Sequence, residues 1–241
     1  MKRLTAAVLC ALGIVCAALA FALTGLETVF LDPARYAAIQ DELNVYPSVG
    51  IAREEQLLID GDLAAYLAGK SDSLARPVTL RGEAVSCAFN ARELAHMEDV
   101  RRLFEKGFAL RRALAVCAVV FLLVPLILRD RKAWGRGLLG ALIISAAAGI
   151  AAFLLLRAAD FDRLFIRFHE LVFSNDLWLL NPETDAMIRM LPDGFFDRMA
   201  LSGSIRALLF ALLPFAVGGA ILPITSKRSK KRKLPILWRK K

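Results

Sequence analysis

The chain has 241 residues, of which 57% are hydrophobic and 23% are charged, and its formal net charge is +9. This apolar share exceeds the roughly 45–50% that is usual for soluble domains, so the composition argues against an ordinary soluble globular protein and indicates a membrane protein. The positive charge does not indicate a nucleic-acid partner, because it gathers beside apolar segments, where it is typical of contact with anionic lipid.

Four apolar runs are long enough, or nearly so, to cross the roughly 30 Å hydrocarbon core of a bilayer. They cover residues 4–23, 113–128, 137–156 and 205–224. The second run is the shortest, and its flanking arginines would have to reach out to the lipid surface. The first run could instead be a cleaved signal peptide, because small residues lie near its end, but it is long for that purpose.

The distribution of charge predicts the orientation of the spans, because lysine and arginine collect on the cytoplasmic side. Basic residues lie at positions 2–3, in the link between the second and third runs, and in the tail 226–241, which holds nine. With four spans these regions share one side, so we expect both termini in the cytoplasm. Residues 30–109 hold 9 basic and 13 acidic side chains, and residues 158–206 hold 5 and 8. We expect both of these acidic segments outside the cytoplasm.

The expected fold is an α-helical integral membrane protein with four transmembrane helices and a small mixed α/β extracytoplasmic cap. In the cap, the spacing of apolar residues predicts helices over 33–43 and 51–70, and residues 78–89 favour a strand around Gly82. The predicted segments are a first span (1–29), the cap (30–109), two spans with a basic link (110–157), a second external segment (158–204), a fourth span (205–225) and a basic tail (226–241).

A polar helix that carries His96 is predicted over residues 90–108. Asn90, followed three residues later by Glu93, has the spacing of a helix N-cap and capping box. We expect this helix to be broken or bent at Gly107 and then to run on into the second span. His96 would then lie about three turns above the membrane.

An amphipathic helix is predicted directly after the third span, over residues 161–173, with an apolar stripe at three- and four-residue spacing. It carries His169, and the chain has only two histidines. Because a short link joins the second and third spans, we expect them to be antiparallel neighbours that bring His96 and His169 together. Two imidazoles at a membrane surface indicate general acid/base chemistry. In the alternative interpretation, both are structural residues bonded to backbone or carboxylate groups.

Other chemistries have less support in the sequence. A catalytic zinc site generally has three protein ligands, and neither an HExxH motif nor a cysteine pair is present. We therefore expect no metal and no cofactor, and we expect Glu93 or Asp99 to fix the tautomer of His96. Cys87 could act as a nucleophile with His96, but its sequence neighbours do not indicate an activated thiol. A serine hydrolase of the common type would need a GxSxG turn.

Two segments carry a specific resemblance: "FNARELAHMEDVRRLF" and "FHELVFSNDLWLLNPETDAMIRMLPDGFFDRM". Together with the four-span layout they resemble the bacterial lipoprotein intramolecular transacylase family, Lit, over the whole chain apart from the basic tail. Ala91 and Ala95 stand where other members more often have larger residues. The resemblance implies a cell-membrane enzyme that moves the sn-2 acyl chain of a diacylglyceryl-modified lipoprotein onto the α-amino group of its own N-terminal cysteine.

The two family histidines match His96 and His169. We expect His96 to be the general base toward the amine and His169 to orient the amine or to protonate the departing glyceryl oxygen, although the roles could be exchanged. Arg92 and Asn175 are candidates to stabilise the oxyanion; alternatively, Arg92 is an exposed cation and Asn175 a helix C-cap. Asp185 either holds its own loop or is a solvated turn residue.

The expected partners are lipoprotein N-termini as substrate and membrane lipids, without nucleic acid, and the chain is expected to be a monomer. Two other functions remain open at this stage. One is a membrane phospholipase or lipid acyltransferase, which would release a fatty acid or use a second lipid as acceptor. The other is a non-enzymatic membrane partner protein with structural histidines.

Overall fold

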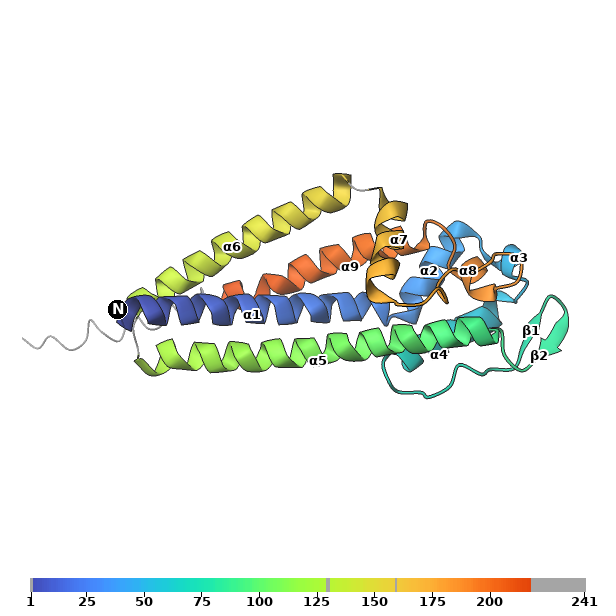
Figure 1. The fold of residues 1–241 in the computed structure, drawn as a ribbon, viewed down its shortest axis with the longest axis horizontal. Coiled ribbons are helices and arrows are strands. Elements are labelled where there is room, and N and C mark those ends of the chain that lie inside the picture. The colour runs from blue at the N-terminus through green and yellow to red at the C-terminus, as the bar shows by residue number, and fades with distance from the viewer. Residues whose placement is uncertain (1, 129–130, 159, 218–241) are drawn as a thin grey trace, which may run out of the picture.

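A computed structural model describes residues 2–128, 131–158 and 160–217. The basic tail 226–241 and the end of the expected fourth span therefore lie outside the described residues. Four long helices run along the molecule (Figure 1): α1 (Lys2–Phe30), α5 (Ala91–Leu128), α6 (Arg131–Ala158) and α9 (Phe195–Ala211). Each contains or begins a stretch that is long and apolar enough to cross a membrane, as the sequence predicted.

The central helix of the bundle is α1, because α5, α6 and α9 all pack against it. Glycines permit this close approach. A Cβ atom on Gly25 would lie 2.7 Å from the carbonyl oxygen of Arg206 in α9, and one on Gly137 would lie 2.5 Å from the Cβ of Cys10. Small residues at helix crossings are a common basis of helix packing in lipid. This packing favours a permanent span over the alternative of a cleaved signal peptide.

The predicted break at Gly107 is wrong, because α5 is one continuous helix of 38 residues. At 1.5 Å per residue it is about 57 Å long, nearly twice the thickness of the hydrocarbon core. A glycine inside a helix costs only about 1 kcal/mol relative to alanine, and the helix on either side of Gly107 outweighs this cost. The charged half of α5, up to Arg112, thus extends beyond its apolar stretch and forms part of the cap.

The expected pairing of the second and third spans is also wrong. α5 and α6 make few contacts with each other, whereas both make extensive contacts with α1. Figure 1 shows α6 leaning away from α5, with α1 between them. The short link keeps one end of each helix near the other, but α1 offers the small residues against which both can pack closely.

The cap gathers at the end of the bundle opposite to the N-terminus (Figure 1). Its elements are α2 (Pro33–Leu43), α3 (Tyr46–Val49), α4 (Arg53–Leu67), β1 (Val78–Leu80), β2 (Glu83–Val85), α7 (Phe161–Val172) and α8 (Ala186–Met190). Ile39, Leu63, Met97 and Met190 belong to one buried apolar cluster that joins α2, α4 and α8 to α5. The cap therefore has its own core, which includes the start of α5, the helix that carries His96.

The expected strand over residues 78–89 is a short hairpin instead. β1 and β2 pair antiparallel, with Val78 opposite Val85 and Leu80 opposite Glu83. Between them, Arg81 and Gly82 both have positive φ angles, of 53° and 87°. Two consecutive residues in this region form the tight turn that matches the twist of a hairpin, and glycine adopts it without strain.

Candidate active site

His96 and His169 meet where the cap joins the bundle. His96 lies in the second turn of α5 and His169 in the last turn of α7, and their ring centroids are 6.2 Å apart. Their residues are only 7% and 8% exposed. The two histidines are therefore close together, but through α7, which crosses the end of the bundle (Figure 1), and not through a pairing of α5 with α6.

The ring of His169 is fixed by its own helix and by aromatic neighbours. Its Nδ1 lies 2.7 Å from the carbonyl oxygen of Phe165. Because a carbonyl can only accept, Nδ1 donates this hydrogen bond, and Nε2 of the neutral ring keeps its lone pair. The rings of Phe165 and Trp178 lie 4.1 Å and 5.0 Å from His169, measured between centroids. Burial lowers the pKa of His169, while the bond to Phe165 opposes this shift, so the ring is neutral at pH 7.

His96 lies in a still less polar environment. Its ring and that of Phe173 pack edge to face, with centroids 5.3 Å apart, and its buried Nδ1 has no hydrogen-bond partner. Burial lowers the pKa of His96 to about 4; the neighbouring His169 adds to this shift and Asp99 opposes it. His96 belongs to the charged half of α5 outside the apolar stretch, and at pH 7 it too is neutral.

Glu93 is a buried carboxylate whose hydrogen bonds go to backbone groups. Its Oε2 accepts a hydrogen bond from the backbone N–H of Asn90 at 2.8 Å, and the Oδ1 of Asn90 accepts from the N–H of Glu93 at 3.0 Å. This is the predicted capping box. The other oxygen, Oε1, accepts from the N–H of Met187 in α8 at 2.6 Å. Among the described residues no hydrogen bond joins Glu93 to His96, whose Nδ1 has no partner, so the expectation that Glu93 fixes the His96 ring is wrong.

Asp99 holds the loop after α7 rather than the ring of His96. Its Oδ2 accepts a hydrogen bond from the side-chain amide of Asn175 at 2.9 Å, and the carbonyl of Asn175 accepts from the indole N–H of Trp178 at 3.0 Å. Trp178 in turn packs on His169. The expected tautomer role of Asp99 is therefore wrong. Asn175 is not the helix C-cap either, because α7 ends earlier, with Phe173 in that position.

The remaining candidates, Arg92 and Asp185, fasten the same region. Arg92 donates to the carbonyl of Asp176 and lies 3.8 Å from its carboxylate, so its guanidinium is bound to the loop after α7. Asp185 is buried, which excludes a solvated turn residue. It accepts hydrogen bonds from the backbone N–H of Asn181 at 2.7 Å and from the side chain of Asn90 at 2.8 Å. Asp185 thus holds its own loop against the start of α5.

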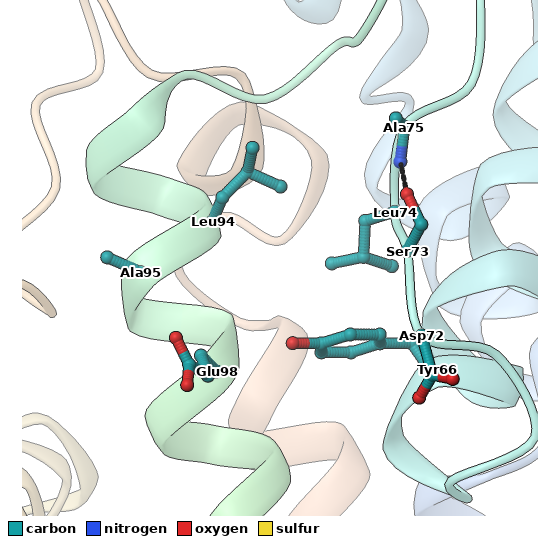
Figure 2. Close-up of a pocket in the computed structure, with 8 residues that line it drawn as sticks. All are labelled: Tyr66, Asp72, Ser73, Leu74, Ala75, Leu94, Ala95 and Glu98. Carbon is teal, nitrogen blue, oxygen red and sulfur yellow. Dashed lines mark hydrogen bonds between the residues drawn. The ribbon is translucent and has the colours of Figure 1, made fainter.

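A cavity of about 390 Å³ lies between α4, the following loop and α5, and it is separate from the histidine pair. Figure 2 shows Leu94 and Glu98 of α5 facing Tyr66 and Leu74 across it. At about 100° per residue, Leu94 and Glu98 lie roughly half a turn around the helix from His96. Among the described residues, no three His, Cys, Asp or Glu side chains come together in a way that could hold a metal ion.

The hydrogen-bond partner of His169 could not be predicted from the sequence. A backbone carbonyl four residues earlier carries no signal in the residue types, and only the side-chain geometry of α7 reveals the contact with Phe165. The aromatic stripe of the helix, Phe173 included, was visible in the sequence, but not that the rings of Phe173 and Trp178 both pack against the imidazole.

A four-span helical bundle with two neutral, buried imidazoles under its cap defines a membrane-integral protein with a candidate acid/base site. The family described as lipoprotein intramolecular transacylase Lit matches residues 11–196, which is most of the chain. The chain belongs to this family and is an acyltransferase, as the resemblance implied.

Solved structures of the membrane integral lipoprotein intramolecular transacylase Lit from Bacillus cereus have the same fold. One matches with a TM-score of 0.68 and 23% identity, and the match covers 95% of this chain and 99% of that chain. A variant with one histidine replaced by arginine matches with a TM-score of 0.66 at 22% identity, covering 95% of both chains. A variant with a histidine replaced by alanine matches with a TM-score of 0.60 at 23% identity, covering 95% and 94%. No curated protein matches the chain by sequence.

Proposed function

We propose that this protein moves the sn-2 acyl chain of a diacylglyceryl-modified lipoprotein onto the α-amino group of its own N-terminal cysteine, with His96 and His169 as the acid/base pair. The observation that carries the proposal is the pair itself: two buried, neutral imidazoles with centroids 6.2 Å apart in a member of the transacylase family. Neutral imidazole can take a proton, and it can also donate one from its N–H.

The hydrogen bond of His169 supports this residue as the base, with the roles exchanged relative to our first expectation. An α-amino group has a pKa of about 7.7–8.0, so much of it is protonated at neutral pH and cannot attack an ester. The Phe165 carbonyl holds the proton on Nδ1 of His169, and this leaves Nε2 to accept the proton of the amine. The neutral ring of His96 then donates its N–H to the ester oxygen, where negative charge develops.

The reaction balances without water or an enzyme nucleophile. The unprotonated amine attacks the ester carbonyl carbon, a C–N bond forms, and one of its two protons passes to His169. The bond between this carbon and the glyceryl oxygen then breaks, and the oxygen takes the proton. The products are an amide and a free hydroxyl group on the same molecule. Because both reacting groups belong to one substrate, the enzyme has to hold them within roughly 3–3.5 Å of each other and move one proton.

We further propose that the cap and the histidine pair lie outside the cytoplasm, with both chain termini inside. Support comes from the charge of the segments, because the cap segment 30–109 has more acidic than basic residues and the link and tail are basic. A lipoprotein substrate would then reach the site from the leaflet at the cap end of the bundle.

Mass spectrometry of lipoprotein N-terminal peptides tests the proposal. The chain is expressed in a bacterium that lacks N-acylation of lipoproteins, and the acyl chains on the amine and on the glyceryl group are located by fragmentation. We expect an N-acylated, S-monoacylglycerylated peptide, and we expect it to disappear with His96→Gln and with His169→Gln at equal protein level. Cys87→Ala is the matched control and should leave the product unchanged.

Four other results of this experiment would each contradict one part of the proposal. Unchanged diacylglyceryl peptides in the presence of the folded chain would exclude the transfer. Release of free fatty acid without N-acylation would indicate a phospholipase instead. Loss of product with Cys87→Ala would indicate a thiol nucleophile, and full activity of either histidine variant would remove that residue from the acid/base pair.

A further inference from the structure

α7 has one polar and one apolar side, and part of its apolar side has no protein cover. Leu164, Phe168 and Leu171 follow one another at spacings of four and three, which places them in one stripe along the helix. Leu171 is 87% exposed, Phe168 45% and Leu164 39%. The charged residues of the helix are Asp162, Arg163, Arg167 and Glu170. Arg167 borders the stripe, and the other three lie farther around the helix.

The apolar side of α7 has an inner and an outer edge. On the inner edge, Phe165 packs on Phe196 of α9, with ring centroids 5.1 Å apart, and His169 packs on Trp178 at 5.0 Å. The outer edge is the stripe of Leu164, Phe168 and Leu171. Among the described residues, other side chains thus cover the inner edge of the apolar side, whereas the outer edge has no such cover.

The position of α7 indicates what covers the outer edge. The helix begins at Phe161, with only two residues between it and the end of α6 at Ala158, so it directly follows a helix that is long and apolar enough to cross a membrane. Figure 1 shows it running across the bundle axis, at the level where the spans give way to the cap. An amphipathic helix that runs across the spans at this level lies in the plane of the membrane interface, with its apolar side in the acyl chains and its charges in the headgroup region.

We propose that the stripe of Leu164, Phe168 and Leu171 docks on the lipid leaflet at the cap end, so that α7 is an interfacial membrane anchor. Leu201 and Ile205 of α9, a helix that α7 contacts, are likewise exposed. His169 projects from the inner edge of the same helix, and the anchor therefore fixes the depth of this imidazole in the membrane. The docking itself does not depend on the proposed function. That the fixed depth brings His169 level with the ester groups of a lipid substrate rests on that function.

Spin-label accessibility in vesicles tests the docking with adjacent pairs of positions. Leu171→Cys is compared with Glu170→Cys, and Phe168→Cys with Arg167→Cys, because neighbours on a helix point about 100° apart. The chain is reconstituted in phosphatidylcholine and phosphatidylglycerol, and the signal of the labelled parent, which keeps its natural cysteines, is subtracted. Collisions with oxygen, which dissolves in acyl chains, are compared with collisions with a water-soluble nickel complex.

We expect the oxygen-to-nickel ratio to be on the order of fivefold higher at positions 168 and 171 than at 167 and 170, since the first pair faces acyl chains and the second faces water. Equal nickel accessibility at all four positions would overturn the proposal, because the stripe would then lie in water. Low accessibility to both reagents at 168 and 171 would also overturn it, because protein, such as a second copy of the chain, would then cover the stripe. Both readouts are independent of acyl transfer, so docking can fail while the proposed function stands.

Discussion

Replacing Glu93 by glutamine tests whether this buried carboxylate is structural or chemical. Glu93 is 1% exposed and accepts hydrogen bonds from the backbone of Asn90 and Met187, which lie in different parts of the chain. Glutamine keeps the shape of the side chain but has only one acceptor oxygen. The other backbone N–H would then face the amide NH₂ group, and two donors cannot bond to each other.

The expected loss of stability follows from these two bonds. A hydrogen bond to a charged group contributes about 1.5–3 kcal/mol, and leaving a buried N–H unsatisfied costs about 1–3 kcal/mol. Burial raises the pKa of Glu93, while the bonds from Met187 and Asn90 lower it. Burying the charged form therefore costs free energy, and the neutral glutamine avoids part of this cost. We expect a net loss of about 2 kcal/mol.

Unfolding of the purified chain in detergent micelles, by heat or denaturant, measures this loss. Glu98→Gln is the control, because this exposed carboxylate on the same helix bonds only to Arg102 among the described residues; it should change stability by less than about 0.5 kcal/mol. The folded Glu93→Gln protein should still transfer acyl chains at a temperature where it is intact. Unchanged stability, or full stability with lost activity, would refute a structural role.

Three further predictions concern other parts of the molecule. Transacylation should persist below pH 6.5, since burial lowers the pKa of His169 and lowers that of His96 to about 4; a kcat profile with its acid midpoint at or above 6.5 would contradict this burial. Burial raises the pKa of Asp60 to about 7, so the folded state loses up to about 4 kcal/mol of stability as pH rises from the unfolded value near 4 through 7. Asp60→Asn lacks this loss, and its advantage in unfolding assays should grow between pH 5 and pH 8; a constant difference would argue against a buried, protonated carboxyl. Gly25→Ala should lower the thermal stability of the bundle by about 1–3 kcal/mol because its Cβ meets the backbone of α9, whereas Gly140→Ala, with no atom within 4 Å, should not; equal effects would exclude a tight crossing.

Elements whose signals lie within a few neighbouring residues were predictable. The helix over 33–43 matches α2 at both ends, because Asp32 caps it and proline can occupy its first turn. The capping box of Asn90 and Glu93 formed as expected for the same reason. The hairpin of β1 and β2 was predicted less well. Arg81, like Gly82, has a positive φ angle in the turn, and arginine is not a residue type that indicates such an angle.

The candidate site was only partly predictable. Two histidines in polar segments next to spans can be found in the sequence, and their proximity was expected, although for the wrong reason. The partners of the surrounding carboxylates could not be inferred, because Met187 and Asn175 lie far from Glu93 and Asp99 along the chain. Nor could the lowered pKa values of His96 and His169 be inferred, since they arise mainly from burial in the folded chain.

The sequence by itself determined the four apolar spans, the polar start of α5 and the amphipathic character of α7, because hydropathy and periodicity are properties of neighbouring residues. Only the tertiary structure decided that α1 stands at the centre, that α7 folds across the bundle and that its histidine meets His96. Those outcomes depend on which surfaces can approach most closely, such as the glycine crossings of α1. Such contacts join residues far apart in the chain, and no local pattern encodes their distance.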